Sequence, residues 1–135
     1  MKTPEEIVSL MLQKDAFSKW LGIEIISLAR NSCRLSCTIK SDMLNGFEIA
    51  HGGIAYSLAD SCLAFAANSS GYQCVSIETS IKHLKKVQLG DCLTSEAIIL
   101  KDEAQKKTFD ISIRNQEGLL VAVFTGAVHV STKIW

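Results

Sequence analysis

The segment from Gly52 to about Asn68 constrains the fold of this chain most, because it is apolar on almost every face of a helix. Alanine and leucine dominate the segment, and Gly71 marks its end. A helix without a broad polar face is normally buried on all sides. We therefore expect a long central helix that the rest of the chain wraps completely.

Most of the remaining segments are strand-like and follow one another without helices between them. The expected strands are Ile23–Ala29, Ser32–Lys40, Gln73–Leu84, Cys92–Leu100, Lys107–Asn115 and Leu119–Ser131. The stretch from Leu119 to Val130 is apolar on both faces and is expected to be a central strand. Consecutive strands predict an antiparallel sheet rather than alternating βαβ units.

The first residues carry three helix-start signals. Thr3 can cap a helix, Pro4 suits its first position, and Glu6 stands where a capping box needs it. Gly22 ends this helical segment, and Asp15 could cap a second short helix, so the sequence leaves one helix or two open. The predicted fold is a single α+β domain over residues 1–135, in which a bent antiparallel sheet of about five to six strands wraps the long helix and a helix stands at the N-terminus.

The charge balance and hydropathy exclude several classes of protein. The chain has 14 Lys and Arg against 14 Asp and Glu, whereas a general nucleic-acid binder needs an excess of positive charge. No apolar run approaches the ~18–20 residues of a membrane helix. The first six residues contain an acidic pair where a signal peptide would begin its apolar core. We expect a cytoplasmic protein that binds neither nucleic acid nor membrane.

Cysteine and histidine usage argues against disulfides and metals. The chain has five scattered cysteines and three histidines, with no CxxC pair and no HExxH sequence. Neither a disulfide framework nor a metal site is expected from this pattern. Cys33 and Cys37 alternate with polar residues in an expected strand, so we predict that both thiols point into the core.

Asp60 is the residue that does not fit its surroundings. It lies in the middle of the apolar helix, where an unpaired carboxylate is costly. A structural role would require a partner, either Ser57 one turn back or a lysine from another element. A perturbed carboxylate in an apolar cleft is more often functional, which makes Asp60 a candidate catalytic residue.

The sequence His51-Gly52-Gly53 stands at the start of the same helix. Two glycines leave the backbone N–H groups of the first turn accessible, and the helix dipole makes this end positive. A glycine amide there could hold a developing oxyanion. The alternative is steric, since glycine also permits a tight turn from loop to helix.

The spacing between these two features predicts an oligomer. Gly52 and Asp60 are about 12 Å apart along a helix that rises ~1.5 Å per residue, whereas reacting groups must approach within ~3–3.5 Å. If both residues act on one carbonyl, the helices of two subunits must lie side by side and antiparallel. The dimer would then hold two sites related by a two-fold axis.

The run Asn45-Gly46-Phe47-Glu48-Ile49-Ala50-His51-Gly52-Gly53, followed by Ser57-Leu58-Ala59-Asp60 and Asn68, resembles the hotdog-fold acyl-CoA thioesterases of the phenylacetic acid degradation (PaaI-like) type. The resemblance extends from about Gly22 to Val130. It implies a sheet wrapped around one helix, and dimers that pair into homotetramers. It also implies hydrolysis of an acyl-CoA to a free acid and CoA. Coenzyme A is then part of the substrate, and no cofactor is expected.

The resemblance also implies roles for individual residues. Asp60 matches the catalytic acid, which acts as general base or as nucleophile. The Gly52 amide matches the oxyanion donor, with Gly53 beside it in the binding motif. Asn45 and His51 match the residues that position the carbonyl and the water. Ser76 falls where some members hold the attacking water, although it could simply be a polar residue on an outward strand face.

Two basic segments could meet the phosphates of CoA. One is Lys82-His83-Leu84-Lys85-Lys86, in which Lys-Lys replaces the Arg-Pro that the family often has. The other is the pair Lys106 and Lys107. Either could equally be a solvated group of lysines near a strand end.

Two other functions remain open from the sequence. A hotdog hydratase or dehydratase resembles a different, proline-rich motif, and Pro4 is the only proline here. A non-catalytic acyl-CoA-binding protein would have no need of Asp60. The aromatic residues Phe47, Tyr56 and Phe65 could line a pocket for an aryl or medium-chain acyl group, or they could belong to the core.

Overall fold

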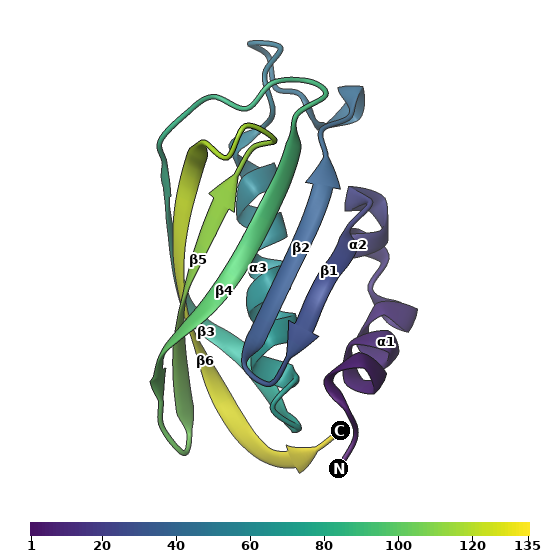
Figure 1. The fold of residues 1–135 in the computed structure, drawn as a ribbon, viewed down its shortest axis with the longest axis vertical. Coiled ribbons are helices and arrows are strands. Elements are labelled where there is room, and N and C mark those ends of the chain that lie inside the picture. Colours follow the sequence, from purple (N-terminus) through teal and green to yellow (C-terminus); the bar gives the residue numbers. More distant parts are fainter.

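The computed structural model describes residues 1–135 as one six-stranded antiparallel sheet curved around one long helix (Figure 1). The long helix, α3, spans Gly52–Asn68, as predicted. The strands are β1 Glu24–Ala29, β2 Ser32–Thr38, β3 Tyr72–His83, β4 Cys92–Asp102, β5 Lys106–Arg114 and β6 Leu120–Ile134. Their order in the sheet is β1-β2-β4-β5-β6-β3. The predicted α+β architecture is confirmed.

Two helices precede the sheet, so the N-terminal segment forms two helices rather than one. Helix α1, Pro4–Lys14, begins where the Thr3 side chain accepts a hydrogen bond from the Glu6 amide. Helix α2, Ala16–Leu21, begins at Asp15, whose Oδ1 accepts from the Ser18 amide at 3.0 Å. Gly22 ends α2 in the left-handed region, with φ of 69°, a conformation that costs glycine little.

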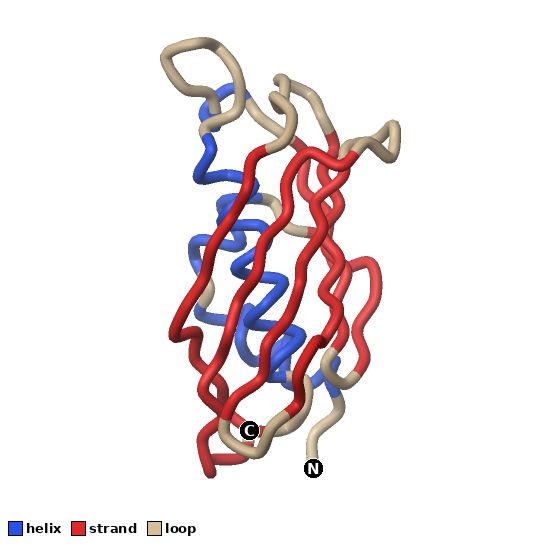
Figure 2. The backbone as a smooth tube through the Cα atoms, turned by 90° about the vertical axis from the view of Figure 1, so that its left-hand side faces the viewer, coloured by secondary structure: helices blue, strands red, loops and turns tan.

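The core lies between α3 and the sheet that curves around it (Figure 2). Leu58 and Phe65 of α3 and Phe109 of β5 are buried there. The thiols of Cys33 and Cys37 are also buried, as their alternation in the sequence predicts. Burial of these large side chains supplies the main driving force that holds the helix in the sheet.

One face of α3 is left uncovered, so the expectation that the chain buries this helix on all sides is wrong. A stripe of small or polar residues along this face is only partly buried, and it consists of Gly53, Ser57, Asp60, Ser61 and Ala64. The residues recur at helical spacing and therefore share one side of the helix. An apolar count cannot tell whether a helix face is covered by its own sheet or by another molecule.

Strand β6 is internal but not at the middle of the sheet. It pairs with β5 on one side and with β3 on the other, whereas β4 and β5 occupy the two middle places. Strand β3 is an edge strand that leaves Val75 and Ile77 exposed at 65% and 58%. None of the helices has the length and apolar character that crossing a bilayer requires.

The segment between β2 and α3 carries much of the predicted motif. It contains a 3-10 turn, Ser41–Met43, and a tight loop closed by a bridge between Leu44 and Ala50. The Ala50 amide also donates to the Val87 carbonyl at 2.8 Å. This bond ties the loop to the segment that joins β3 to β4, so both lie at the N-terminal end of α3 (Figure 1).

Candidate active site

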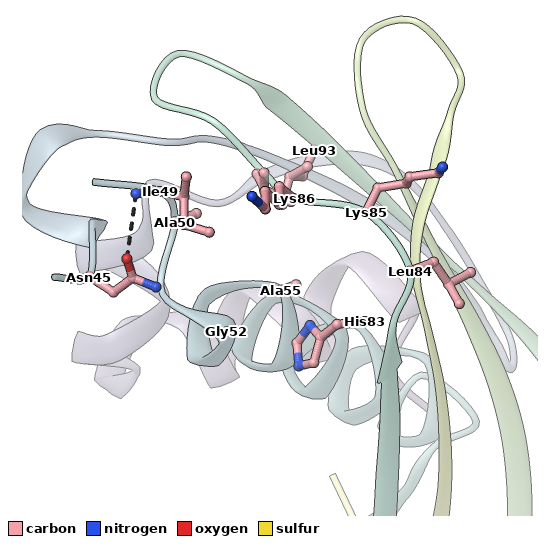
Figure 3. A pocket seen from close by; sticks show the side chains of 11 residues that line it. Asn45, Ile49, Ala50, Gly52, Ala55, His83, Leu84, Lys85, Lys86 and Leu93 are labelled. Atoms are coloured by element: carbon pink, nitrogen blue, oxygen red, sulfur yellow. Dashed lines mark hydrogen bonds between the residues drawn. The ribbon is translucent and has the colours of Figure 1, made fainter. Parts of the chain in front are cut away.

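A pocket opens at the N-terminal end of α3 (Figure 3). Its volume is about 320 Å³, and its polar wall includes Asn45, Gly52, His83, Lys85 and Lys86. The β2–α3 loop, the first turn of α3 and the end of β3 thus come together from distant parts of the sequence. No three side chains of His, Cys, Asp or Glu gather as possible metal ligands in the structure.

Asn45 shapes the loop and also faces the pocket. Its Oδ1 accepts hydrogen bonds from the amides of Phe47, at 2.9 Å, and Ile49, at 3.5 Å. Because the oxygen is held in this way, Nδ2 points toward the cavity, where it has no partner (Figure 3). The Asn45 side chain can therefore donate a hydrogen bond to a bound molecule.

The start of α3 offers one free backbone donor. His51 caps the helix, and its Nδ1 accepts from the Gly53 amide at 2.9 Å. The Gly52 amide, by contrast, donates to no acceptor in the chain, as expected for the first turn of a helix. A Cβ atom on Gly52 would lie 3.4 Å from Nε2 of His83. Glycine therefore keeps this free N–H, at the positive end of the helix, accessible from the pocket.

Asp60 lies in a second cleft on the uncovered face of α3. This cleft has a volume of about 300 Å³ and is lined by Asp15, Phe17, Ser18, Ser57, Asp60, Ser61 and Ala64. Burial raises the pKa of the Asp60 carboxyl above its ordinary value. The carboxyl takes part in none of the hydrogen bonds or ion pairs of the chain, so neither Ser57 nor a lysine supplies the partner that a structural role requires.

A single chain does not bring the free Asp60 carboxylate and the free Gly52 amide together. The pocket at Gly52 and the cleft at Asp60 share no lining residue. Both residues lie on the uninterrupted helix α3, which keeps them about 12 Å apart along its axis. An Asp side chain cannot span that distance.

The other predicted binding residues are spread over the molecule. Ser76 is exposed on the edge strand β3, opposite Val128 of β6. Lys82 faces the outer side of the sheet, in a hollow with Asp110 and away from the pocket at Gly52. Lys86 directs its ammonium toward that pocket, whereas Lys85 directs its ammonium away (Figure 3).

Lys106 and Lys107 begin β5, at the opposite end of the sheet from the pocket (Figure 1). Lys107 is buried, with 7% of its surface exposed. Its ammonium donates to Oδ1 of Asn31 at 2.8 Å and lies 3.4 Å from a carboxylate oxygen of Asp102. Asn31 occupies the left-handed region, with φ of 57°. The contacts of Lys107 are those of a residue that stabilises the turn between β1 and β2.

Sequence reasoning missed the part of the Asp60 cleft that comes from α2. Asp15 is recognisable as a helix cap, but nothing in the sequence places α2 beside Asp60. Ser18 makes that connection, because its Oγ lies 2.9 Å from Oγ of Ser61. No short motif encodes such a contact across 43 residues of sequence.

Comparison with known proteins identifies the family. The sequence profile of the thioesterase superfamily matches residues 47–122. The chain belongs to this superfamily. A curated relative is the acyl-coenzyme A thioesterase PaaI of Escherichia coli (strain K12), 39% identical over 119 residues that cover 88% of this thioesterase and 85% of the relative.

Solved structures agree with the assignment. The E. coli PaaI protein from the phenylacetic acid degradation operon superposes with a TM-score of 0.94 at 35% identity, over 97% of this thioesterase and 95% of that chain. A hypothetical thioesterase from Streptococcus pneumoniae TIGR4, crystallised with coenzyme A, gives a TM-score of 0.87 at 26% identity, over 93% and 98%. The chain is thus a hotdog-fold thioester hydrolase of the PaaI type, as the resemblance implies.

Replacement of Lys107 by methionine tests the structural role of its ammonium. Lys107→Met keeps the apolar stem but leaves the Asn31 oxygen without its donor. We expect the free energy of unfolding in urea to fall by about 1–3 kcal/mol, with the KM for thioester hydrolysis unchanged. Lys106→Met, at the exposed neighbouring position, should leave both quantities unchanged. A raised KM in Lys107→Met would contradict this interpretation.

Proposed function

We propose that this thioesterase hydrolyses acyl-CoA to a free carboxylic acid and CoA, at two sites that form between two protomers. The acyl-CoA substrate is supported by the curated PaaI relative, by the streptococcal structure that contains coenzyme A, and by the pocket at Gly52. One observation carries the proposal. The chain holds a partly buried carboxylate and a helix-terminal amide, both without partners and both on α3, that cannot meet within one molecule.

An antiparallel pair of α3 helices would bring these groups together. The uncovered stripe has only small residues around Asp60, namely Gly53, Ser57, Ser61 and Ala64, and small residues let two helices approach closely. A two-fold axis that sets Gly52 beside the partner's Asp60 also sets Asp60 beside the partner's Gly52. The same pairing would cover the helix face that the protomer leaves open.

The edge strand β3 supports the same arrangement. Its exposed Val75 and Ile77 lie on a strand with one unpaired side, which is the usual place for a strand of another chain to add. Pairing there would place Ser76 near the interface, where it could hold a water molecule. We also propose that two such dimers form a tetramer, and the exposed Ile98 and Leu100 of β4 offer an apolar surface for it.

In the shared site, the thioester carbonyl oxygen would accept hydrogen bonds from the Gly52 amide and from Nδ2 of Asn45. Both donors are unused in the protomer and stand at the positive end of α3, so negative charge that develops on this oxygen is stabilised. His51 holds the first turn of the helix through Gly53. Its capping contact fixes the direction in which the Gly52 amide points.

Asp60 of the facing protomer would supply the base. A raised pKa makes its carboxylate more basic than an ordinary one, which favours proton transfer from water. The water oxygen bonds to the carbonyl carbon as Asp60 takes the proton, and collapse of the tetrahedral intermediate breaks the C–S bond. The CoA thiolate leaves and takes up the proton that Asp60 accepted, which regenerates the Asp60 carboxylate. The same carboxylate could instead attack the carbonyl carbon directly, with water hydrolysing the resulting anhydride.

We place the CoA phosphates near Lys86, at the mouth of the pocket. His83 and Lys85 stand beside it on the same segment. Lys107 has its own partners, and Lys82 and Lys106 lie elsewhere on the sheet, so we leave them out of the proposed site. For the acyl group, we propose an aryl or medium-chain substituent, on the similarity to a protein of the phenylacetic acid degradation operon.

The role of Asp60 is tested by Asp60→Asn, which keeps the size of the side chain but removes the basic carboxylate. We expect kcat for acyl-CoA hydrolysis to fall by about 10²–10⁴-fold, measured as release of free thiol, with the oligomer and the circular dichroism spectrum unchanged. Asp42→Asn changes an exposed acid outside both pockets and should retain wild-type turnover.

The outcome also separates the alternative functions. Near wild-type turnover in Asp60→Asn would contradict the mechanism. Tight binding of acyl-CoA by the wild-type protein without thiol release would indicate a binding protein instead. Hydration of an enoyl-CoA would indicate a hydratase.

Lys86→Ala tests the placement of the phosphates. Loss of one partly solvated ammonium–phosphate contact, worth about 1 kcal/mol, should raise KM for acyl-CoA about fivefold with kcat nearly unchanged. Lys106→Ala should leave KM unchanged. A raised KM in Lys106→Ala with an unchanged KM in Lys86→Ala would contradict this placement. It would put the phosphates at the start of β5, the other basic segment that the sequence suggests.

A further inference from the structure

The cleft around Asp60 has an uneven lining. The side chains that α3 contributes are small: Ser57, Ser61 and Ala64. The one large apolar side chain in the cleft is Phe17, which comes from α2. Its surface is 54% exposed in the protomer, so it presents aromatic area that a bound molecule can cover.

Helix α2 is fixed in place beside Asp60. The Ser18 hydroxyl lies 2.6 Å from Oδ2 of Asp15, to which it donates, and 2.9 Å from Oγ of Ser61. Only 1% of the Ser18 surface is exposed, so these bonds are shielded from water. They join the residue directly after Phe17 to the residue directly after Asp60. These bonds therefore hold the Phe17 ring and the Asp60 carboxylate in the same cleft.

The position of Phe17 matters because of what Asp60 must reach. Water activated by Asp60, or the carboxylate itself, has to stand within ~3–3.5 Å of the thioester carbonyl carbon. The acyl substituent begins one bond beyond that carbon. If it enters the cleft that exposes Asp60, it meets Phe17, and an aryl ring there can pack against the phenyl ring in an offset or edge-to-face manner.

We infer that Phe17 is the wall of the acyl-binding pocket and that it determines which acyl groups this thioesterase accepts. This inference rests on the proposed function, because it requires Asp60 to act at the thioester. Phe17 closes the cleft to long chains and offers an aromatic surface to aryl groups. The substrate class it favours is a CoA thioester of an arylacetic or similarly compact aryl acid.

The test compares Phe17→Ala with Leu10→Ala. Leu10 is a suitable control because it is an exposed apolar residue of the neighbouring helix α1, with 39% of its surface exposed, and does not line the cleft. Trp20 is unsuitable because its ring packs against Phe17, with 5.8 Å between the ring centroids. Each variant is assayed with phenylacetyl-CoA and with straight-chain acyl-CoA substrates from acetyl to lauroyl. In Phe17→Ala, kcat/KM for the aryl substrate should fall about tenfold relative to that for the long-chain substrates. In Leu10→Ala, the ratio should stay within about twofold of the wild-type ratio.

Other results would overturn the inference or locate the error. An unchanged ratio in Phe17→Ala would overturn it, and an unchanged ratio with an equal loss of activity on every substrate would indicate a purely structural role. If Phe17→Ala does not fold, Phe17→Leu keeps the apolar volume and should still lower the aryl preference; an unchanged preference there would also overturn the inference. Full activity in Asp60→Asn would instead show that the proposed function itself is wrong.

Discussion

The constraint on which this structure depends is a carboxylate without a partner on the uncovered face of a buried helix. Asp60 breaks the apolar pattern of α3, and burial raises the pKa of its carboxyl. Folding alone would favour a neutral side chain there. The same helix begins at Gly52, whose amide has no acceptor. This amide lies about two helical turns before Asp60. A basic carboxylate and an oxyanion donor thus stand on one rigid element, at a separation that only a second copy of the element can close.

The fold around α3 follows from this arrangement. The sheet and the two N-terminal helices cover α3 except along the stripe that contains Asp60, and strand β3 has one unpaired side at the edge of the sheet. At the helix N-terminus, the β2–α3 loop places Asn45 beside Gly52, while the end of β3 brings His83 and Lys86 to the same pocket. On the other side, α2 completes the cleft at Asp60. The two halves of the proposed site are therefore built separately and at different ends of the exposed stripe.

Much of the fold was predictable from local sequence patterns. The bounds of α3 follow from its apolar composition and flanking glycines, the capping of α1 from Thr3 and its neighbours, and the burial of Cys33 and Cys37 from strand alternation. Local sequence patterns did not predict features that depend on contacts between distant parts of the chain. The exposed stripe of α3 was not recognised from the sequence because its small residues, such as Gly53 and Ala64, suit a contact with another helix as well as a core. Lys107 looks like a surface lysine, but its burial depends on Asn31, 76 positions away. The contact of Ser18 with Ser61 likewise arises only when α2 docks on α3.

The central claim is that each site needs Asp60 from one protomer and the Gly52 end of α3, with Asn45, from another. Asn45→Ala and Asp60→Asn chains can be co-expressed with different tags, and assemblies that contain both can be purified. Each variant alone should be nearly inactive. A mixed dimer combines the two intact halves in one of its two sites, so the mixed assemblies should recover about a quarter to a half of wild-type thioesterase activity. Mixed assemblies no more active than either parent variant would contradict the account.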